Sequence, residues 1–213
     1  MGIGGLLSLQ KLSCIKANQG SYLIRELGEL KQLRSLRISD FRREDGNAVC
    51  SSVQKLTNLF SSFLVFNEII DLQYLSSPPP SLQRLHLEGR LDKLPQWISS
   101  LPHLAKVQLS RSQLQDDPLE SLHDPLPNLV ELKFYRAYEG QALHFRAGGF
   151  QRLRKLLLHS LLGFNAAFGS CKIFSGKYLF SGNAIFRKGK YFQMFGCIMK
   201  IFLENNFMCL VTF

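Results

Sequence analysis

A short pattern of apolar residues recurs seven times along the chain, and it constrains the fold more than any other feature. The pattern returns after 24, 26, 23, 22, 25 and 24 residues. Its central leucines, which we call the anchors, are Leu9, Leu33, Leu59, Leu82, Leu104, Leu129 and Leu153. Positions three before, three after and five after each anchor are apolar except at Pro79 and Ser62. A period of roughly 20 to 50 residues indicates an array of stacked units.

The residues after each anchor are expected to form a short strand. Side chains alternate along a strand, so the third and fifth positions after the anchor point inward and the second, fourth and sixth point outward. One unit cannot bury its own leucines, so neighbouring strands must stack in parallel while the rest of each period returns over the other side. The pattern resembles that of leucine-rich repeats. It predicts an α/β solenoid with a parallel β-sheet on the concave face and irregular turns or short helices on the convex face.

Two return segments can be read in more detail. Apolar residues recur about every three positions from Leu91 to Leu104, and Pro95 is expected to start a tight helical or 3₁₀ turn there. Ile24, Leu27 and Leu30 repeat this spacing. Pro78–Pro80, by contrast, predicts an extended loop and excludes a helix at that point.

The third unit allows two registers. Either Ser62 points inward with Leu64, or a slip of one residue turns Phe60, Phe63 and Val65 inward instead. The two registers expose opposite sets of side chains, so we assign no binding residue to this strand.

The composition changes near residue 160. Of 38 leucines, 35 lie at or before Leu162, whereas 10 of 17 phenylalanines lie after it. We therefore expect a repeat domain over residues 1–160, incomplete at its N-terminus, and a Phe-, Gly- and Lys-rich tail over 161–213 outside the repeat fold. The tail has no sustained apolar period, which favours translated non-coding or frame-shifted sequence over an amphipathic segment that contacts a membrane surface.

The outward positions of the predicted strands carry a mixed set of polar side chains suited to protein recognition. The candidate binding residues are Arg37, Arg84, His86, Glu88, Lys106, Gln108, Glu131, Lys133, Tyr135 and Lys155. The alternative is that they are simply solvated strand positions. The outward positions of the first unit are expected to be Lys11, Ser13 and Ile15, with Cys14 inward.

The sequence offers no catalytic, cofactor or metal motif. The histidines on predicted strands have no carboxylate at a productive spacing, and residues 171–178 fail the phosphate-loop pattern. The five cysteines are irregularly spaced, which argues against a zinc site or a disulfide framework. The net charge of +10 is not gathered on the repeats: residues 1–159 carry 20 basic and 15 acidic side chains. We therefore expect no enzyme, no cofactor and no nucleic-acid partner, and a cytoplasmic location.

Several stretches are similar to the C-terminal repeats of plant coiled-coil NBS-LRR disease-resistance proteins. The most specific lies between Leu82 and Leu109, and others are Ile24–Leu36, Leu126–Leu132 and Phe150–Leu156, so the resemblance covers roughly residues 3 to 159. It implies a fragment of an intracellular immune receptor, without that family's nucleotide-binding motifs. Its partner would be a pathogen effector, a guarded host protein or the receptor's nucleotide-switch domain. The alternative is a general intracellular leucine-rich-repeat scaffold of the Ras-suppressor type.

Overall fold

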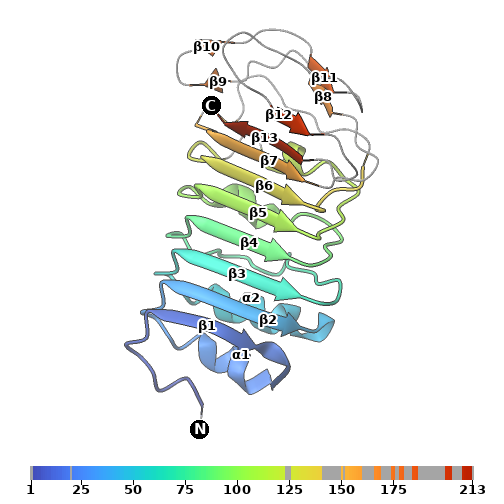
Figure 1. The fold of residues 1–213 in the computed structure, drawn as a ribbon. Coiled ribbons are helices and arrows are strands. Elements are labelled where there is room, and N and C mark those ends of the chain that lie inside the picture. Colours follow the sequence, from blue (N-terminus) through green and yellow to red (C-terminus); the bar gives the residue numbers. More distant parts are fainter. Residues whose placement is uncertain are drawn as a thin grey trace.

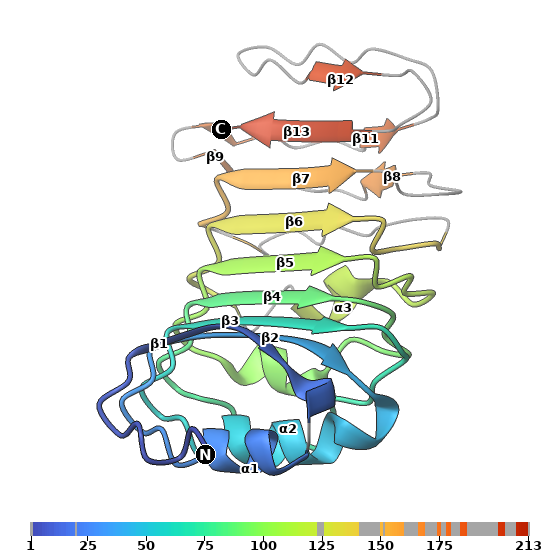
Figure 2. The ribbon, with the colours of Figure 1, turned by 60° about the horizontal axis from the view of Figure 1, so that its bottom comes forward.

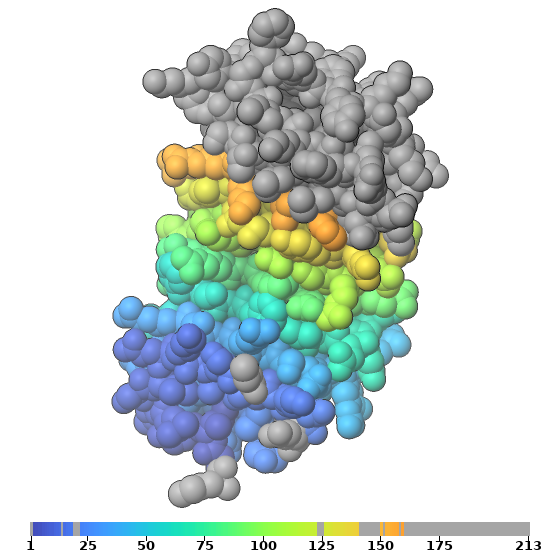
Figure 3. Space-filling model, viewed as in Figure 1, coloured from blue at the N-terminus to red at the C-terminus, as the bar shows by residue number. Residues whose placement is uncertain are grey.

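The structure is a computed structural model of the 213-residue chain. It describes residues 2–19, 21–122, 126–140, 150 and 152–159, together with six short strands beyond them. The described residues follow one another in bands along the long axis of the molecule, from the N-terminus onward (Figure 3).

Seven parallel strands form one continuous sheet, stacked in sequence order (Figure 1). Each strand begins two residues after an anchor leucine, as the repeat predicts. The strands are β1 (Lys11–Lys16), β2 (Ser35–Phe41), β3 (Ser61–Phe66), β4 (Arg84–Glu88), β5 (Lys106–Ser110), β6 (Glu131–Tyr135) and β7 (Lys155–His159). The predicted α/β leucine-rich-repeat solenoid is therefore confirmed.

Inward-facing side chains of neighbouring strands lie directly opposite one another. One ladder runs through Leu12, Leu36, Ser62, Leu85, Val107, Leu132 and Leu156. A second, two residues on, contains Ile38, Leu64, Leu87, Leu109 and Phe134. Together with the anchors they build one extended core, because each unit covers the apolar side chains of the next.

The third unit adopts the first of the two possible registers. Ser62, Leu64 and Phe66 are buried, whereas Ser61, Phe63 and Val65 are half-buried on the concave side. The slipped register is therefore wrong. Ser62 lies in the ladder between Leu36 and Leu85 and pairs with both.

The first strand departs from the prediction at its end. The pairing of β1 with β2 contains a bulge between Leu12 and Ile15, so Ile15 lies opposite the inward-facing Ile38. Ile15 packs against the core. The expectation that Ile15 points outward is wrong, because the extra residue of the bulge reverses the alternation.

Short helices and turns cover the opposite side of the sheet (Figure 2). They become less regular along the chain, from α-helical in the first two units to 3₁₀ or single-turn in later ones. The elements are η1 (Ala17–Gln19), α1 (Ser21–Leu27), η2 (Arg43–Asp45), α2 (Gly46–Val53), η3 (Gln96–Ser100) and α3 (Pro118–Leu122). Pro95 immediately precedes η3, and residues 78–80 contain no helix, as predicted.

Four of the seven parallel strands share a corner, a residue with positive φ near the end of the strand. Asp40, Gly89, Arg111 and Arg136 occupy equivalent positions, five residues after the first residue of their strands, and all have positive φ. The amides of Gly89, Arg111 and Arg136 donate to the last strand carbonyl of the next repeat, at 2.9, 2.6 and 2.9 Å. At Gly89 the φ is 131°, and a Cβ there would lie 2.2 Å from the Phe66 carbonyl oxygen, so this corner requires glycine.

The other end of each strand repeats a second hydrogen-bond motif. The carbonyl of the residue after each anchor accepts two amides from the following repeat. Gln10, Arg34, Phe60, Gln83, Ala105 and Val130 all do so, with N to O distances between 2.7 and 3.1 Å. The β4–β5, β5–β6 and β6–β7 junctions carry both hydrogen-bond motifs.

The sheet continues past His159 with strands of opposite direction. β13 (Met208–Thr212) pairs antiparallel with β7, and β12 (Lys200–Phe202) pairs antiparallel with β13. Two small hairpins lie in between, formed by β8 (Ala166–Phe168) with β11 (Ala184–Phe186) and by β9 (Phe174–Ser175) with β10 (Tyr178–Leu179). The division into a repeat domain over 1–160 and a separate tail over 161–213 stays a prediction.

Candidate protein-binding surface

The ten candidate residues all lie on the concave side of the sheet, in three columns that cross the strands. The first column contains Arg84, Lys106, Glu131 and Lys155, the middle column contains Arg37, His86, Gln108 and Lys133, and the third contains Glu88 and Tyr135. Columns form because parallel pairing in register places equivalent residues opposite one another. Two groups of side chains make contact within this surface.

The first group, which we call the aromatic stack, joins β2, β3 and β4. The guanidinium carbon of Arg37 lies 4.2 Å from the centre of the Phe63 ring. Phe63 meets His86 edge to face, with ring centres 4.0 Å apart. A similar cation–π contact places Arg84 5.4 Å from the Phe60 ring. These contacts hold two arginines over apolar rings on an otherwise polar face.

His86 is a neutral member of the stack. Burial, together with the positive charges of Arg37 and Lys133, lowers the pKa of His86 to about 4. Its Nε2 atom hydrogen-bonds with the Ser110 hydroxyl at 3.0 Å and lies 3.9 Å from Glu88. Because the ring is uncharged near pH 7, the approach to Glu88 is not an ion pair.

The second group, which we call the lysine cluster, surrounds Glu131 on β6. Lys106 on β5 and Lys155 on β7 lie directly opposite Glu131, and Lys133 is two residues further along β6. Their ammonium nitrogens approach the carboxylate oxygens to 2.8, 3.5 and 2.6 Å respectively. The Glu131 side chain is 10% exposed, whereas those of Lys106 and Lys155 are 49% and 42% exposed. One covered carboxylate thus holds three ammonium groups, two of them well exposed.

The lysines keep Glu131 ionised. Burial alone would raise its pKa, but hydrogen bonds from Lys106 and Lys133 and the charges of both lysines outweigh that effect and lower the pKa to about 2. The cluster therefore carries a net charge of three minus one, or +2, across the neutral pH range.

The remaining candidates make separate contacts. Glu88 pairs with the corner residue Arg111. The Gln108 amide donates to the Ser110 hydroxyl at 3.3 Å, and the Tyr135 ring lies 5.6 Å from the His159 ring. Arg37 on β2 and Lys155 on β7 stand at opposite ends of the surface, with four strands between them.

The sequence reasoning missed Phe63, which lies at the centre of the aromatic stack. It was left out because the third unit allowed two registers. The signal that decides between them is in the sequence. Leu59 is the anchor and Leu56 lies three residues before it, as in the other units. This alignment places Ser62 inward and Phe63 outward.

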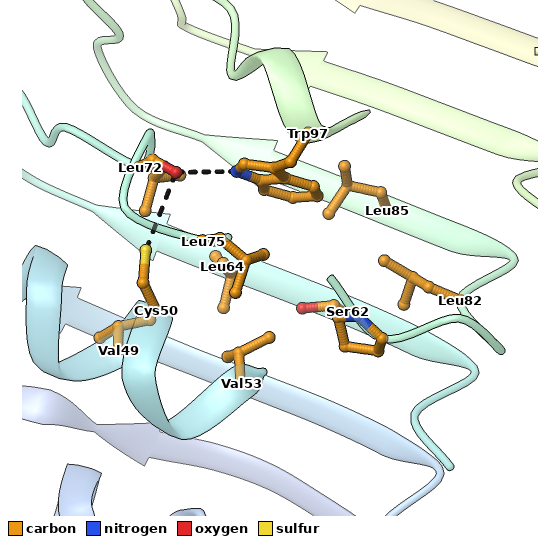
Figure 4. Close-up of a pocket in the computed structure, with 11 residues that line it drawn as sticks. Val49, Cys50, Val53, Ser62, Leu64, Leu72, Leu75, Leu82, Leu85 and Trp97 are labelled. Atoms are coloured by element: carbon orange, nitrogen blue, oxygen red, sulfur yellow. Dashed lines mark hydrogen bonds between the residues drawn. The ribbon is translucent and has the colours of Figure 1, made fainter. Parts of the chain in front are cut away.

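A small apolar void lies beside Ser62 in the described core (Figure 4). Its volume is about 10 Å³, and its lining includes Val53, Leu64, Leu85 and Trp97. The Ser62 hydroxyl is buried without a hydrogen-bond partner among the described residues. The Trp97 indole N–H donates to the Leu72 carbonyl at 2.7 Å and closes one side. This space is a packing defect of the core.

The part of the chain that the structure describes contains no group of three or more His, Cys, Asp or Glu side chains that could hold a metal ion. None of its helices is long and apolar enough to cross a membrane.

Comparison with known proteins agrees with the geometry. The family model described as leucine-rich repeat region matches residues 1–172. A solved leucine-rich-repeat protein of Leptospira interrogans superposes with a TM-score of 0.57 at 23% identity, over 79% of this chain and 40% of that one, which supports the fold.

Two of the most similar curated relatives are plant proteins. Disease resistance protein RPM1 of Arabidopsis thaliana is 36% identical over 71% of this chain, and disease resistance protein Pik-2 of Oryza sativa subsp. japonica is 33% identical over 62%. The chain spans 16% and 14% of the lengths of these two proteins. The resemblance seen in the sequence is thereby confirmed. The chain belongs to the leucine-rich repeat family, in the branch whose named relatives are plant disease resistance proteins.

Proposed function

We propose that the chain is a non-catalytic protein-recognition module of the plant immune-receptor class, acting in the cytoplasm. Its concave face would bind a pathogen effector, a guarded host protein or the nucleotide-switch domain of a receptor. The observation that carries the proposal is the continuous concave surface of β2 to β7, where partly exposed polar and aromatic side chains from six strands lie in register.

The composition of this surface suits protein binding. Arginine and aromatic side chains are the residues that most often dominate binding energy at protein interfaces. Here Arg37, Phe63 and Arg84 are held by stacking contacts before any partner arrives, so less side-chain entropy is lost on binding. The names of the plant relatives support a role in disease resistance.

The surface is poorly suited to acid–base catalysis. A general base works best with a pKa near the working pH. His86 has a pKa of about 4, and Glu131, with a pKa of about 2, is covered by three lysines. Neither group is placed to exchange protons near pH 7.

Site-specific photo-crosslinking tests the proposal. A benzophenone amino acid is placed at Tyr135, on the concave face, or at Tyr74, which is 60% exposed on the return side of its repeat. Both variants are expressed in plant cells with and without a pathogen challenge, and crosslinked proteins are identified by mass spectrometry.

We expect one protein, or a small set, to crosslink at position 135 and not at position 74. The same crosslink should disappear when Arg37→Glu is added, because that change removes the cation–π contact on the concave face. Partners captured equally at both positions, or at position 74 alone, would contradict concave-face recognition.

A further inference from the structure

The charge of the concave face points to the chemistry of its partner. Among the outward positions of the seven strands, the basic residues are Lys11, Lys16, Arg37, Arg84, Lys106, Lys133 and Lys155, and the acidic residues are Glu88 and Glu131. Lys16 pairs with Asp40 of β2. Glu88 is paired with Arg111, and Glu131 is covered by the lysine cluster. The surface that a partner meets is therefore cationic, although the repeats as a whole are nearly balanced in charge.

The lysine cluster has unused hydrogen-bond capacity. Each ammonium group has three N–H donors, and the approach to Glu131 occupies one of them. Lys106 and Lys155 are about half exposed, so their remaining donors can reach a second anion. Glu131 itself brings the three ammonium groups together and reduces their mutual repulsion.

We infer that the concave face binds an extended acidic segment of a partner protein, with a partner carboxylate seated on Lys106, Lys133 and Lys155 and an apolar side chain packed on Phe63. This inference rests on the proposed protein-recognition function and names the partner's chemistry. The partner segment crosses the strands, because the two subsites lie on the same face of different strands, β3 and β6.

The spacing of the subsites sets the spacing in the partner. Phe63 and Lys133 both occupy the middle column, three strands apart. Neighbouring strands are about 4.8 Å apart, so the subsites are separated by roughly 14 Å, which an extended chain covers in about four residues. The recognised motif is thus an apolar or aromatic residue about four positions from an aspartate or glutamate.

A random library of short displayed peptides tests this inference on the full chain. The library is panned against the wild-type protein, the double variant Lys106→Gln/Lys155→Gln, and Lys93→Gln, an exposed residue on the return side that serves as the matched control. The double variant keeps Lys133 on Glu131, so the buried carboxylate is not left unpaired. Circular dichroism melting confirms that each variant is folded.

We expect wild type and Lys93→Gln to select acidic peptides with the stated spacing. The best peptide should bind the double variant at least about tenfold more weakly, the effect of losing a charge-assisted hydrogen bond. An analogue of this peptide with Asn or Gln in place of its Asp or Glu should bind the wild-type protein more weakly by a similar factor.

The remaining outcomes separate this inference from the proposed function. If the selected peptides lose binding to the Phe63→Ala variant but show no preference for acidic residues, the inference is overturned and protein recognition still stands. Peptides that bind every concave variant equally, or no peptides at all, would overturn both. Stronger binding of single-stranded DNA with the same lysine dependence would show that the surface serves a nucleic acid, and would also overturn the inference.

Discussion

Replacing Ser62 with valine is expected to stabilise the protein. At the equivalent position of the ladder the other units carry Leu12, Leu36, Leu85, Val107, Leu132 and Leu156. The Ser62 side chain is buried without a partner for its hydroxyl among the described residues, beside a void of about 10 Å³. A void of this size holds about one water-sized sphere, so it has room for one added methyl group.

The magnitude follows from two contributions. Burying an unpaired hydroxyl costs about 1 to 3 kcal/mol, which the substitution removes. Each newly buried methyl group adds about 0.8 kcal/mol. We expect Ser62→Val to raise the free energy of unfolding by about 2 kcal/mol, which corresponds to an increase in Tm of about 4 to 8 °C for a chain of this size.

Urea and thermal unfolding followed by circular dichroism measure the change. Ser62→Ala separates the two contributions, because it removes the hydroxyl without filling the void, and should gain about 1 kcal/mol at most. Ser62→Leu adds more volume than the void offers and should gain less than valine. A loss of stability in both Ser62→Val and Ser62→Ala would refute the reasoning, since it would mean that the hydroxyl has a bound water as its partner.

Other positions give equally direct expectations. Gly89→Ala should destabilise the protein by about 3 kcal/mol or more, because φ is 131° and the new Cβ would meet the Phe66 carbonyl. Arg136→Gly, at an equivalent corner, should change the stability by no more than about 1 kcal/mol. Similar urea midpoints for the two variants would contradict this expectation. Leu85→Asp should unfold the central repeats in thermal scans, because it buries an unpaired charge, while Arg84→Ala leaves Tm nearly unchanged. The folded-state pKa of Glu131 is about 2, which lies below its unfolded value. The ionised Glu131 therefore contributes about 3 kcal/mol to the free energy of unfolding at neutral pH, and this stabilisation is lost as the pH falls from about 5 to 2. Urea unfolding of Glu131→Gln should lack that part of the acid dependence, and an unchanged pH profile would argue against the lysine contacts.

The sequence predicts the solenoid well because its main determinant is local and repeated. The start of each strand follows directly from its anchor leucine, and the buried ladder follows from the alternation of side chains. The deviations are single-residue events. The bulge that turns Ile15 inward adds one residue to a strand and leaves no trace in the apolar period. The left-handed corners at Arg111 and Arg136 carry no glycine that would mark them.

The candidate surface was predicted as a set of positions rather than as contacts. Periodicity places Glu131 and the three lysines on one face, but the convergence of Lys106, Lys133 and Lys155 on one carboxylate depends on register between three strands. The low exposure of Glu131 also has a tertiary cause, since its carboxylate lies against lysines of the two neighbouring strands. Phe63 was missed for a different reason: the apolar run of the third unit allowed two registers, although Leu56 and Leu59 indicate the one observed.

The hydrogen bonds between repeats have a consequence for how such surfaces diversify. The motif at the strand start recurs at all six junctions between β1 and β7, and the junctions from β4 to β7 also use main-chain groups at the strand end. A crossover between genes that exchanges whole repeats can therefore keep these main-chain hydrogen bonds while it changes the side chains on the concave side. Recombination of repeats can therefore produce new recognition surfaces while the fold of the solenoid is kept.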